Sequence, residues 1–317
     1  MLTFLWRAFG VLLMLSALAL PLLRAPDRTV DTLVARWAPP PSDFIDLRGQ
    51  LVHVRDEGPR WDPTPLVLIH GTSSSLHTWQ GWVAGLKERR RVITFDLPGF
   101  GLTGPFAGSY TPDDYSGDAL ARFTLDLMDR LKVRRAVMVG NSLGGEVAWR
   151  VASLAPERVA SLVLVDASGY RFTPDDLPLG FRLARNPAMA WIGETLLPRS
   201  VIERTVYGVY ADPRRVTPEV IDRYYELTLR EGNRRALRLR LAGLEADLEP
   251  ERIPKLRVPT LVLWGGKDKL IPPAVGAQFA RDIIGAKLVV LDELGHVPQE
   301  ENPERSLAPV REFLGVR

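Results

Sequence analysis

Residues 136–145 read AVMVGNSLGG, and this stretch decides the fold. Its first four residues form a continuous apolar run, as in a strand that is buried on both faces of a parallel sheet. Gly140-Asn141-Ser142-Leu143-Gly144 then fits the G-x-S-x-G pattern, and a helical pattern follows. A strand, a sharp turn with a serine at its tip and a helix are the setting of a nucleophile elbow. A phosphate-binding turn would need a Walker lysine or a dinucleotide glycine pattern, and neither is present here. The stretch therefore predicts a reactive serine, Ser142, at one edge of a sheet.

Apolar runs and helical patterns alternate on both sides of this stretch. Further buried strands are predicted at residues 66–69, 92–95, 162–165, 260–264 and 287–291, and a hairpin at residues 44–47 and 50–55. Helices are predicted at residues 78–89, 113–131, 145–154, 274–283 and 304–314. Alternating elements of this length indicate an α/β fold with an open, mostly parallel central sheet.

One interval interrupts the alternation. Residues 168–248 contain only helical patterns, chiefly at residues 181–197, 218–230 and 234–247. Because an insertion at a loop tip leaves the contacts of a sheet intact, we interpret this interval as an inserted helical cap. The predicted organisation is then a core of residues 44–167 and 249–317, the cap, a Pro-rich spacer of residues 25–43 with a short helix at 29–37, and an N-terminal segment of residues 1–24.

The N-terminal segment, MLTFLWRAFGVLLMLSALALPLLR, has sixteen uncharged residues between Arg7 and Arg24. A span of roughly 17–25 apolar residues can cross a membrane. The favourable free energy of inserting its leucines into a bilayer outweighs the cost of burying the Arg7 charge, because a side chain near a helix end can reach the headgroups. We predict an uncleaved N-terminal hydrophobic helix that anchors the protein to a membrane. The alternative is a secretory signal with an Ala17-Leu18-Ala19 cleavage site and a secreted or periplasmic product. Arginines flank both ends, so the side of the membrane stays open.

The composition of the 317 residues excludes several classes of protein. There is no cysteine, which rules out disulfides, a thiolate nucleophile and an iron–sulfur cluster. The net charge is only +3, and arginines alternate with acidic residues instead of gathering in one basic stretch. We therefore expect no nucleic-acid partner. The sequence does not indicate the oligomeric state.

A serine hydroxyl needs a base to remove its proton, and the chain has four histidines, His53, His70, His77 and His296. His296 follows the predicted strand at residues 287–291, so its imidazole can reach a serine at the same sheet edge. The acid that would orient this base is Asp268, after the strand at residues 260–264. Asp166, directly after the strand at residues 162–165, is the competing acid.

The negative charge that develops on a substrate carbonyl needs preorganised donors. The backbone N–H of Leu143, next after the serine at a helix start, supplies one. The other is predicted to be the N–H of Thr72, in the loop that begins at His70-Gly71. His70 is then a structural residue that holds this loop.

The order Ser142, Asp268, His296, with His70-Gly71-Thr72 upstream and Asp96-Leu97-Pro98-Gly99-Phe100-Gly101 between, resembles the α/β-hydrolase superfamily. The resemblance covers about residues 44–317. The cap stretches at residues 216–219 and 230–234, and Gly140-Asn141-Ser142, are similar to capped members near the meta-cleavage-product hydrolases and esterases.

This resemblance implies a serine hydrolase that cleaves carboxylic esters through a Ser-His-Asp triad and an acyl-enzyme. Alternatives are hydrolysis of a C–C bond in a ring-fission diketo acid, a haloperoxidase-like side activity, or a non-catalytic protein of the same fold. No metal or organic cofactor is implied. The expected partner is a small, ester-like, apolar substrate, and its acyl chain is open. Aromatic residues of the cap and one methionine are candidates for pocket walls or, more commonly, for the cap's own core: Phe181, Met189, Trp191, Tyr207, Tyr210, Tyr224 and Tyr225.

Overall fold

The structure is a computed structural model that describes residues 24–171, 194–244 and 246–316, together with Trp6, Arg7, Gly10 and Met14. The predicted hydrophobic helix at residues 1–24 and the predicted helix at residues 181–197 thus lie largely outside the described residues. Within the described ranges, no helix is long and apolar enough to cross a membrane.

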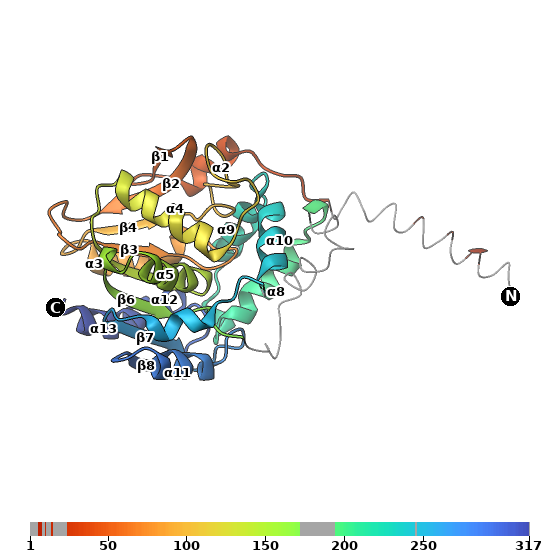
Figure 1. Cartoon of the computed structure of the whole chain (residues 1–317). Helices are drawn as coiled ribbons and strands as arrows, with labels where there is room; N and C mark the ends of the chain where they lie inside the picture. The colour runs from red at the N-terminus through yellow and green to blue at the C-terminus, as the bar shows by residue number, and fades with distance from the viewer. Residues whose placement is uncertain are drawn as a thin grey trace.

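A sheet of eight strands, in the spatial order β1-β2-β4-β3-β5-β6-β7-β8, forms the centre of the described structure (Figure 1). The strands are β1 (Asp43–Leu47), β2 (Gln50–Glu57), β3 (Leu66–Ile69), β4 (Val92–Phe95), β5 (Ala136–Asn141), β6 (Val159–Val165), β7 (Thr260–Gly265) and β8 (Lys287–Leu291). β2 pairs antiparallel with β1 and β4, and the strands from β4 to β8 are mutually parallel. The predicted mostly parallel α/β sheet is confirmed.

Helices cover both faces of the sheet, which explains why the central strands are apolar at nearly every position. One face carries α4 (Gly117–Arg130), α5 (Leu143–Leu154) and α11 (Pro273–Asp282). The other carries α3 (Gln80–Leu86), after the short 3-10 turn η1 (Leu76–Trp79), and α12 (Pro298–Glu301) and α13 (Pro303–Leu314). Every residue of β3, β4, β5 and β7 is buried between these layers.

Local signals decide where two of these helices begin. α4 starts at Gly117 instead of the predicted residue 113, because the Ser116 hydroxyl accepts a hydrogen bond from the Ala119 N–H and caps the first turn. α5 starts directly after Ser142, two residues earlier than predicted. This early start puts the N–H of Leu143 at a helix N-terminus.

Between β6 and β7 the described residues form three longer helices and no strand. These are α8 (Arg199–Val209), α9 (Pro218–Thr228) and α10 (Asn233–Gly243), at the right of the sheet in Figure 1. α9 and α10 match predicted helices, whereas α8 was not predicted. A 3-10 turn, η5 (Pro250–Lys255), leads back to the sheet.

The spacer before the sheet packs on this helical region. It contains α2 (Val30–Trp37), which confirms the short helix predicted at residues 29–37. The Trp37 indole donates to the Glu226 carboxylate of α9 at 2.7 Å, and the Arg28 backbone N–H donates to the Leu229 carbonyl.

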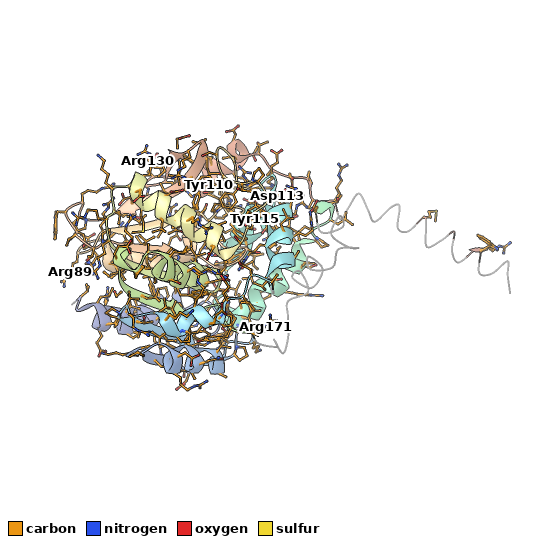
Figure 2. All side chains as sticks on the ribbon, viewed as in Figure 1. Arg89, Tyr110, Asp113, Tyr115, Arg130 and Arg171 are labelled. Atoms are coloured by element: carbon orange, nitrogen blue, oxygen red, sulfur yellow. The ribbon has the colours of Figure 1, made fainter. Side chains whose placement is uncertain are left out.

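Elsewhere the side chains fill the space between layers, and exposed arginines such as Arg89, Arg130 and Arg171 reach outward at separate places (Figure 2).

Candidate active site

Ser142 lies at the tip of the turn between β5 and α5. Its backbone has φ 55° and ψ −118°, a conformation that an L-residue adopts only when its surroundings impose it. The Ser142 N–H donates to the Val165 carbonyl of β6, and its own carbonyl accepts from the N–H groups of Glu146 and Ser168. These bonds hold the turn rigidly at the carboxyl end of β5.

Two glycines of the predicted motif are required by close backbone approaches. A Cβ atom at Gly140 would lie 2.0 Å from the Gly144 carbonyl oxygen, and one at Gly144 would lie 2.0 Å from the Ile69 carbonyl oxygen of β3. No side chain fits at such distances, because the obstructing atoms belong to the backbone. The G-x-S-x-G spacing therefore follows from the packing of the turn against its own helix and against β3.

His296 and Asp268 meet at the carboxyl ends of β8 and β7. The His296 Nδ1 donates to Asp268 Oδ2 at 2.7 Å, and both residues are buried. The other oxygen, Oδ1, accepts from the N–H groups of Leu270 and Ile271 at 2.8 and 3.0 Å. With Nδ1 donating to the carboxylate, Nε2 is free to accept a proton, as a general base requires.

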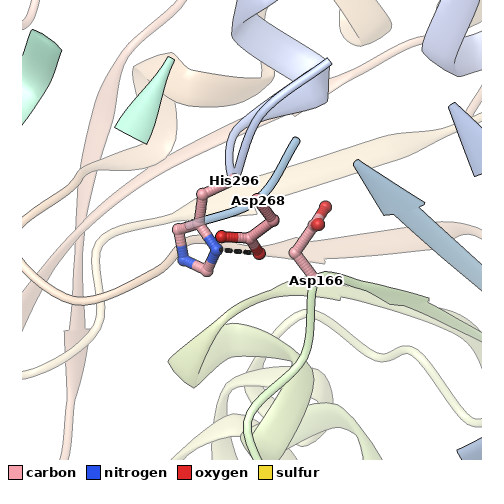
Figure 3. A group of neighbouring side chains, drawn as sticks. All are labelled: Asp166, Asp268 and His296. Carbon is pink, nitrogen blue, oxygen red and sulfur yellow. Dashed lines mark hydrogen bonds and ion pairs between the residues drawn. The ribbon is translucent and has the colours of Figure 1, made fainter. Parts of the chain in front are cut away.

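Asp166, the competing acid, lies in the same cluster but does not bond to the imidazole (Figure 3). Its Oδ1 accepts from the Gly265 N–H at 2.8 Å, and its Oδ2 is buried with no partner among the described residues. Burial and the charge of Asp268 raise the pKa of Asp166 well above its usual range. Of the two acids, the structure thus pairs Asp268 with His296.

Asp166, Asp268 and His296 offer ligand atoms within 4.8 Å of one another, the kind of group that can hold a metal ion. The Asp268 and His296 atoms already take part in hydrogen bonds, however. Asp268 already accepts two backbone N–H groups and the imidazole, and the Nδ1 that faces the acids carries the hydrogen of that bond. A cation there would have to displace these bonds, so the donor set fits an acid–histidine pair better than a metal.

The loop after β3 lies beside the serine. Gly71 is packed so closely that a Cβ there would approach the Ser142 Cβ at 3.1 Å. Neither the Thr72 nor the Leu143 N–H donates to another group in the described part of the chain. The His70 Nδ1 donates to the Gly71 carbonyl at 2.8 Å, and its Nε2 accepts from the Leu97 N–H at 2.9 Å. Burial lowers the pKa of His70, so it is neutral and ties this loop to the segment after β4.

The remaining two histidines belong to a separate buried cluster. His53 Nδ1 donates to Asp96 Oδ2 at 2.7 Å, and His77 Nε2 donates to the Trp37 carbonyl at 2.8 Å. Burial lowers the pKa of His77 to about 3. Neither residue lines the cavity that holds Ser142, so His53 and Asp96 form a structural pair despite their short bond.

Ser142 and His296 line one cavity of about 200 Å³, although no hydrogen bond joins their side chains in the described structure. Such bonds are often long without substrate and tighten when it binds. Thr72, Leu143 and Asn141 share the wall. The rest of the wall is mainly aliphatic, and much of it comes from the segment between β6 and β7: Leu196, Leu197, Pro198, Val201, Ile202, Val206, Leu237, Leu241 and Leu244.

The side chains named as candidates for pocket walls or for the core of the helical region divide between these roles. Phe181, Met189 and Trp191 lie outside the described residues, and of the other four only Tyr224 lines the cavity. Tyr210 packs in the core of the helical region, and Tyr207 is exposed. Leu237 and Leu241 of α10 line the cavity beside Tyr224.

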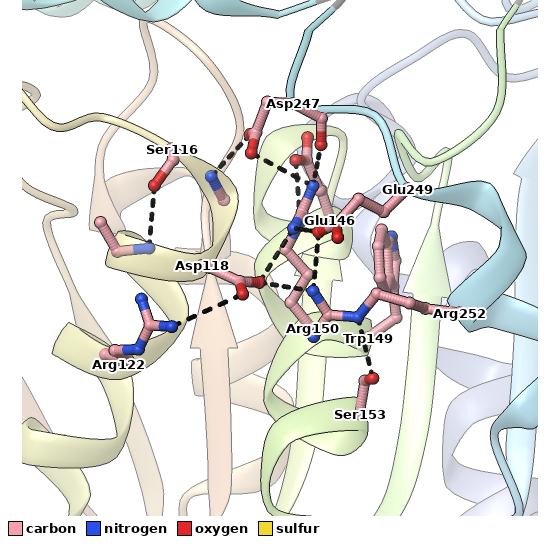
Figure 4. A network of polar contacts seen from close by, with 12 residues as sticks. Ser116, Asp118, Arg122, Glu146, Trp149, Arg150, Ser153, Asp247, Glu249 and Arg252 are labelled. Carbon is pink, nitrogen blue, oxygen red and sulfur yellow. Dashed lines mark hydrogen bonds and ion pairs between the residues drawn. The ribbon is translucent and has the colours of Figure 1, made fainter.

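The few charges in the cavity wall are mostly paired. Glu146, one turn after Ser142, binds Arg240 of α10 at 2.6 Å with both side chains buried. It also accepts from Arg150, the centre of a network with Asp118, Asp247, Glu249 and Arg252 (Figure 4). This network ties α5, and hence the serine turn, to the end of the helical region.

Two further residues that sequence reasoning did not single out hold the histidine loop. The Asn141 side-chain amide donates to the His296 carbonyl at 2.9 Å and to the Val165 carbonyl at 3.2 Å. Glu301 accepts from the N–H groups of Gly295, Ala211 and Asp212. Asn141 lies inside the serine motif, which is a usable signal, whereas nothing local in the sequence distinguishes Glu301 from a surface acid.

Comparison with known proteins agrees with this architecture. The family model described as alpha/beta hydrolase fold matches residues 64–303. A dihydrolipoyllysine-residue acetyltransferase component of an acetoin cleaving system from Pseudomonas putida is 35% identical over 255 residues, 79% of this chain. The match spans 63% of that relative, less than two thirds of its length. A 2-hydroxy-6-oxononadienedioate/2-hydroxy-6-oxononatrienedioate hydrolase from Pseudomonas sp is 30% identical over 290 residues, 86% of this chain and 96% of the relative.

Solved structures extend the likeness to three dimensions. A thermophilic esterase from Thermogutta terrifontis superposes with a TM-score of 0.69 at 26% identity, covering 92% of this chain and 98% of the esterase. The family match covers most of the chain, and it includes both the serine turn and the histidine loop. The chain therefore belongs to the α/β-hydrolase fold family and is a hydrolase of that superfamily.

Proposed function

We propose that this hydrolase cleaves carboxylic esters, with Ser142 as nucleophile, His296 as general base and acid, and Asp268 as the residue that orients the imidazole. The observation that carries the proposal is the 2.7 Å bond from His296 Nδ1 to Asp268, in a cavity that also exposes Ser142 on a strained turn.

In this mechanism Nε2 of His296 takes the Ser142 proton as the hydroxyl oxygen attacks the ester carbonyl. The N–H groups of Thr72 and Leu143 stabilise the oxyanion, and the second of these lies at the N-terminus of α5, where the helix dipole favours negative charge. His296 then protonates the leaving alcohol. Water, activated by the same imidazole, releases the acid and restores the serine.

The lining of the cavity supports an apolar substrate. Aliphatic side chains of α8 and α10 form much of its wall. Its charged members are already in ion pairs: Glu146 with Arg240, Glu194 with Arg238, and Arg234 with Asp27. An uncharged acyl or alcohol chain can enter without breaking such a pair, whose separation in a buried place is costly.

The test is Ser142→Ala, assayed with p-nitrophenyl esters of increasing acyl length. We expect kcat to fall by at least about 10³-fold while the fold is retained. Labelling of the serine by a fluorophosphonate should disappear in this variant and persist in Ser109→Ala, an exposed serine. Ester turnover at the wild-type rate in Ser142→Ala would refute the assignment.

A second candidate is hydrolysis of a C–C bond in a ring-fission diketo acid by the same residues. It is favoured by the two relatives at 30% identity whose names state such substrates, the Pseudomonas hydrolase above and a 2-hydroxymuconate semialdehyde hydrolase from Pseudomonas sp. (strain CF600). Rapid turnover of a ring-fission dienoate together with poor ester turnover would select this candidate.

A further inference from the structure

Asp166 is a fully buried acid next to the proposed triad to which the mechanism gives no task. It follows β6 directly, and its N–H donates to the Leu263 carbonyl of β7. Its backbone has φ 46°, a left-handed conformation that is uncommon outside glycine and costs free energy. The fold thus holds this carboxyl group firmly at the carboxyl edge of the sheet, between the strands that lead to Ser142 and Asp268.

The hydrogen bonds of Asp268 leave one acceptor position unused. A carboxylate has about four lone-pair positions, two on each oxygen. Oδ1 of Asp268 accepts from the Leu270 and Ile271 N–H groups, which fills both of its positions. Oδ2 accepts from His296 only. One position on Oδ2 therefore remains.

Asp166 has the complementary deficiency. Its Oδ1 accepts the Gly265 N–H, but Oδ2 has no partner among the described residues and no contact with solvent. A bare carboxylate oxygen in that position would be an unpaired buried charge beside a second carboxylate, a costly arrangement. A proton on Oδ2 removes the charge and supplies the donor that Asp268 lacks.

The charged groups around Asp166 favour the same protonation state. It faces Asp268 on the loop after β7, His296 on the loop after β8 and Glu301 on α12. Burial contributes most to the raised pKa of Asp166, and the negative charges of Asp268 and Glu301 raise it further. With three N–H donors, Asp268 is the better stabilised anion, so the proton belongs on Asp166.

We propose that Asp166 is a neutral carboxylic acid that donates a hydrogen bond from Oδ2 to Asp268, and that it is a positioning residue for the His296 imidazole. The bond fixes the rotation of the Asp268 carboxylate, and it withdraws part of that group's negative charge from the imidazolium. This inference rests on the proposed function for its kinetic consequence. The protonation state itself does not depend on which bond the enzyme cleaves.

The decisive variant is Asp166→Asn, which keeps the shape, the acceptor for Gly265 and a donor toward Asp268 but cannot ionise. Because Asp166 is neutral in our proposal, this variant should keep kcat/KM within about threefold of the wild type, and the acid limb of the pH profile should move by less than about 0.3 pH unit. Asp166→Ala removes the donor, and its acid limb should move upward by about half to one pH unit, with a lower kcat. If Asp166→Asn keeps the wild-type pH profile and Asp166→Ala does not, the residue acts through its hydrogen-bond donor and not only through its volume.

An ionised Asp166 would give a different pH profile. If Asp166 were ionised, Asp166→Asn would remove a negative charge within 4.8 Å of an imidazole nitrogen. The acid limb would then fall by about one to two pH units. That shift would overturn the proposal. Asp129→Asn, at a mostly exposed aspartate paired with Arg158, is the matched control and should leave the profile unchanged.

An infrared measurement separates this inference from the proposed function. The wild-type protein at pH 7 should show the C=O stretch of a buried protonated carboxylic acid, and this band should be absent in Asp166→Asn and present in Asp129→Asn. Loss of the band with ester activity intact supports the proposal, and so does loss of the band in a protein without ester activity. An unchanged spectrum in Asp166→Asn overturns the proposal and leaves the esterase assignment standing.

Discussion

Asp268→Asn is the substitution whose effect the structure allows to be worked out most fully. The asparagine keeps the size of the side chain, and its carbonyl oxygen can still accept the N–H groups of Leu270 and Ile271. Its amide then faces Nδ1 of His296, and two donors cannot share that bond. The imidazole must move its hydrogen to Nε2, the nitrogen that has to accept the serine proton.

The loss of charge adds to this change of tautomer. In the wild type a carboxylate lies 2.7 Å from Nδ1, and both side chains are almost completely buried. At a charge separation of about 4 Å and an effective dielectric constant of about 20, the carboxylate stabilises the imidazolium by about 4 kcal/mol. We therefore expect kcat/KM of Asp268→Asn to fall by about 10³-fold or more at pH 7.

The assay is kcat/KM for a p-nitrophenyl ester between pH 5 and 10, with thermal unfolding of each variant as the check on folding. Part of the activity should return at high pH, where hydroxide can replace the general base. Asp129→Asn is again the control. An Asp268→Asn enzyme that stays within about tenfold of the wild type at pH 7 would contradict the assigned role of Asp268.

Three further predictions concern the scaffold. Arg150→Met should lower the free energy of unfolding in urea by about 3–5 kcal/mol, because Glu146 and Asp118 lose a buried cationic partner. Arg122→Met removes an exposed partner of the same Asp118 and should change that free energy by less than about 0.5 kcal/mol. Equal losses in the two variants would show that the buried network does not stabilise the fold. Gly144→Ala should lower the free energy of unfolding by at least about 1–3 kcal/mol and remove most of the activity, because its Cβ would lie 2.0 Å from the Ile69 carbonyl oxygen. Gly243→Ala, with open space around it, should leave that free energy unchanged or raise it. The Glu300 side chain is only 5% exposed. This burial by itself would raise its pKa, but Arg223 and hydroxyl donors hold that pKa below its usual value. The stability that Glu300 contributes is therefore present at neutral pH and is lost as the pH falls, so the difference in Tm between Glu300→Gln and the wild type should shrink from about pH 6 to about pH 3. A difference that grows on acidification would contradict this prediction.

Much of the fold could be predicted because its signals are local. β3 and β4 match their predicted bounds, since each is a short apolar run between turn residues. The helix at residues 199–209 was missed because Pro198 and the two preceding leucines resemble the end of an earlier helix, while the packing of α8 on α9 is a tertiary contact. The sequence left open, for the same reason, whether the aromatic residues line the pocket or the core: helical spacing identifies a buried face, and it does not say which neighbour that face meets.

The sequence by itself determined the order of the strands along the chain and the presence of a strained serine turn, because apolar periodicity and glycine spacing act over a few residues. It also narrowed the base and the acid to a few candidates at strand ends. Only the tertiary structure decided that His296 binds Asp268, that Asp166 is left with an orphaned oxygen, and that the His53–Asp96 pair lies apart from the cavity. Those outcomes depend on which strands are neighbours in the sheet and on ångström distances between loops far apart in the sequence, and no local pattern encodes either.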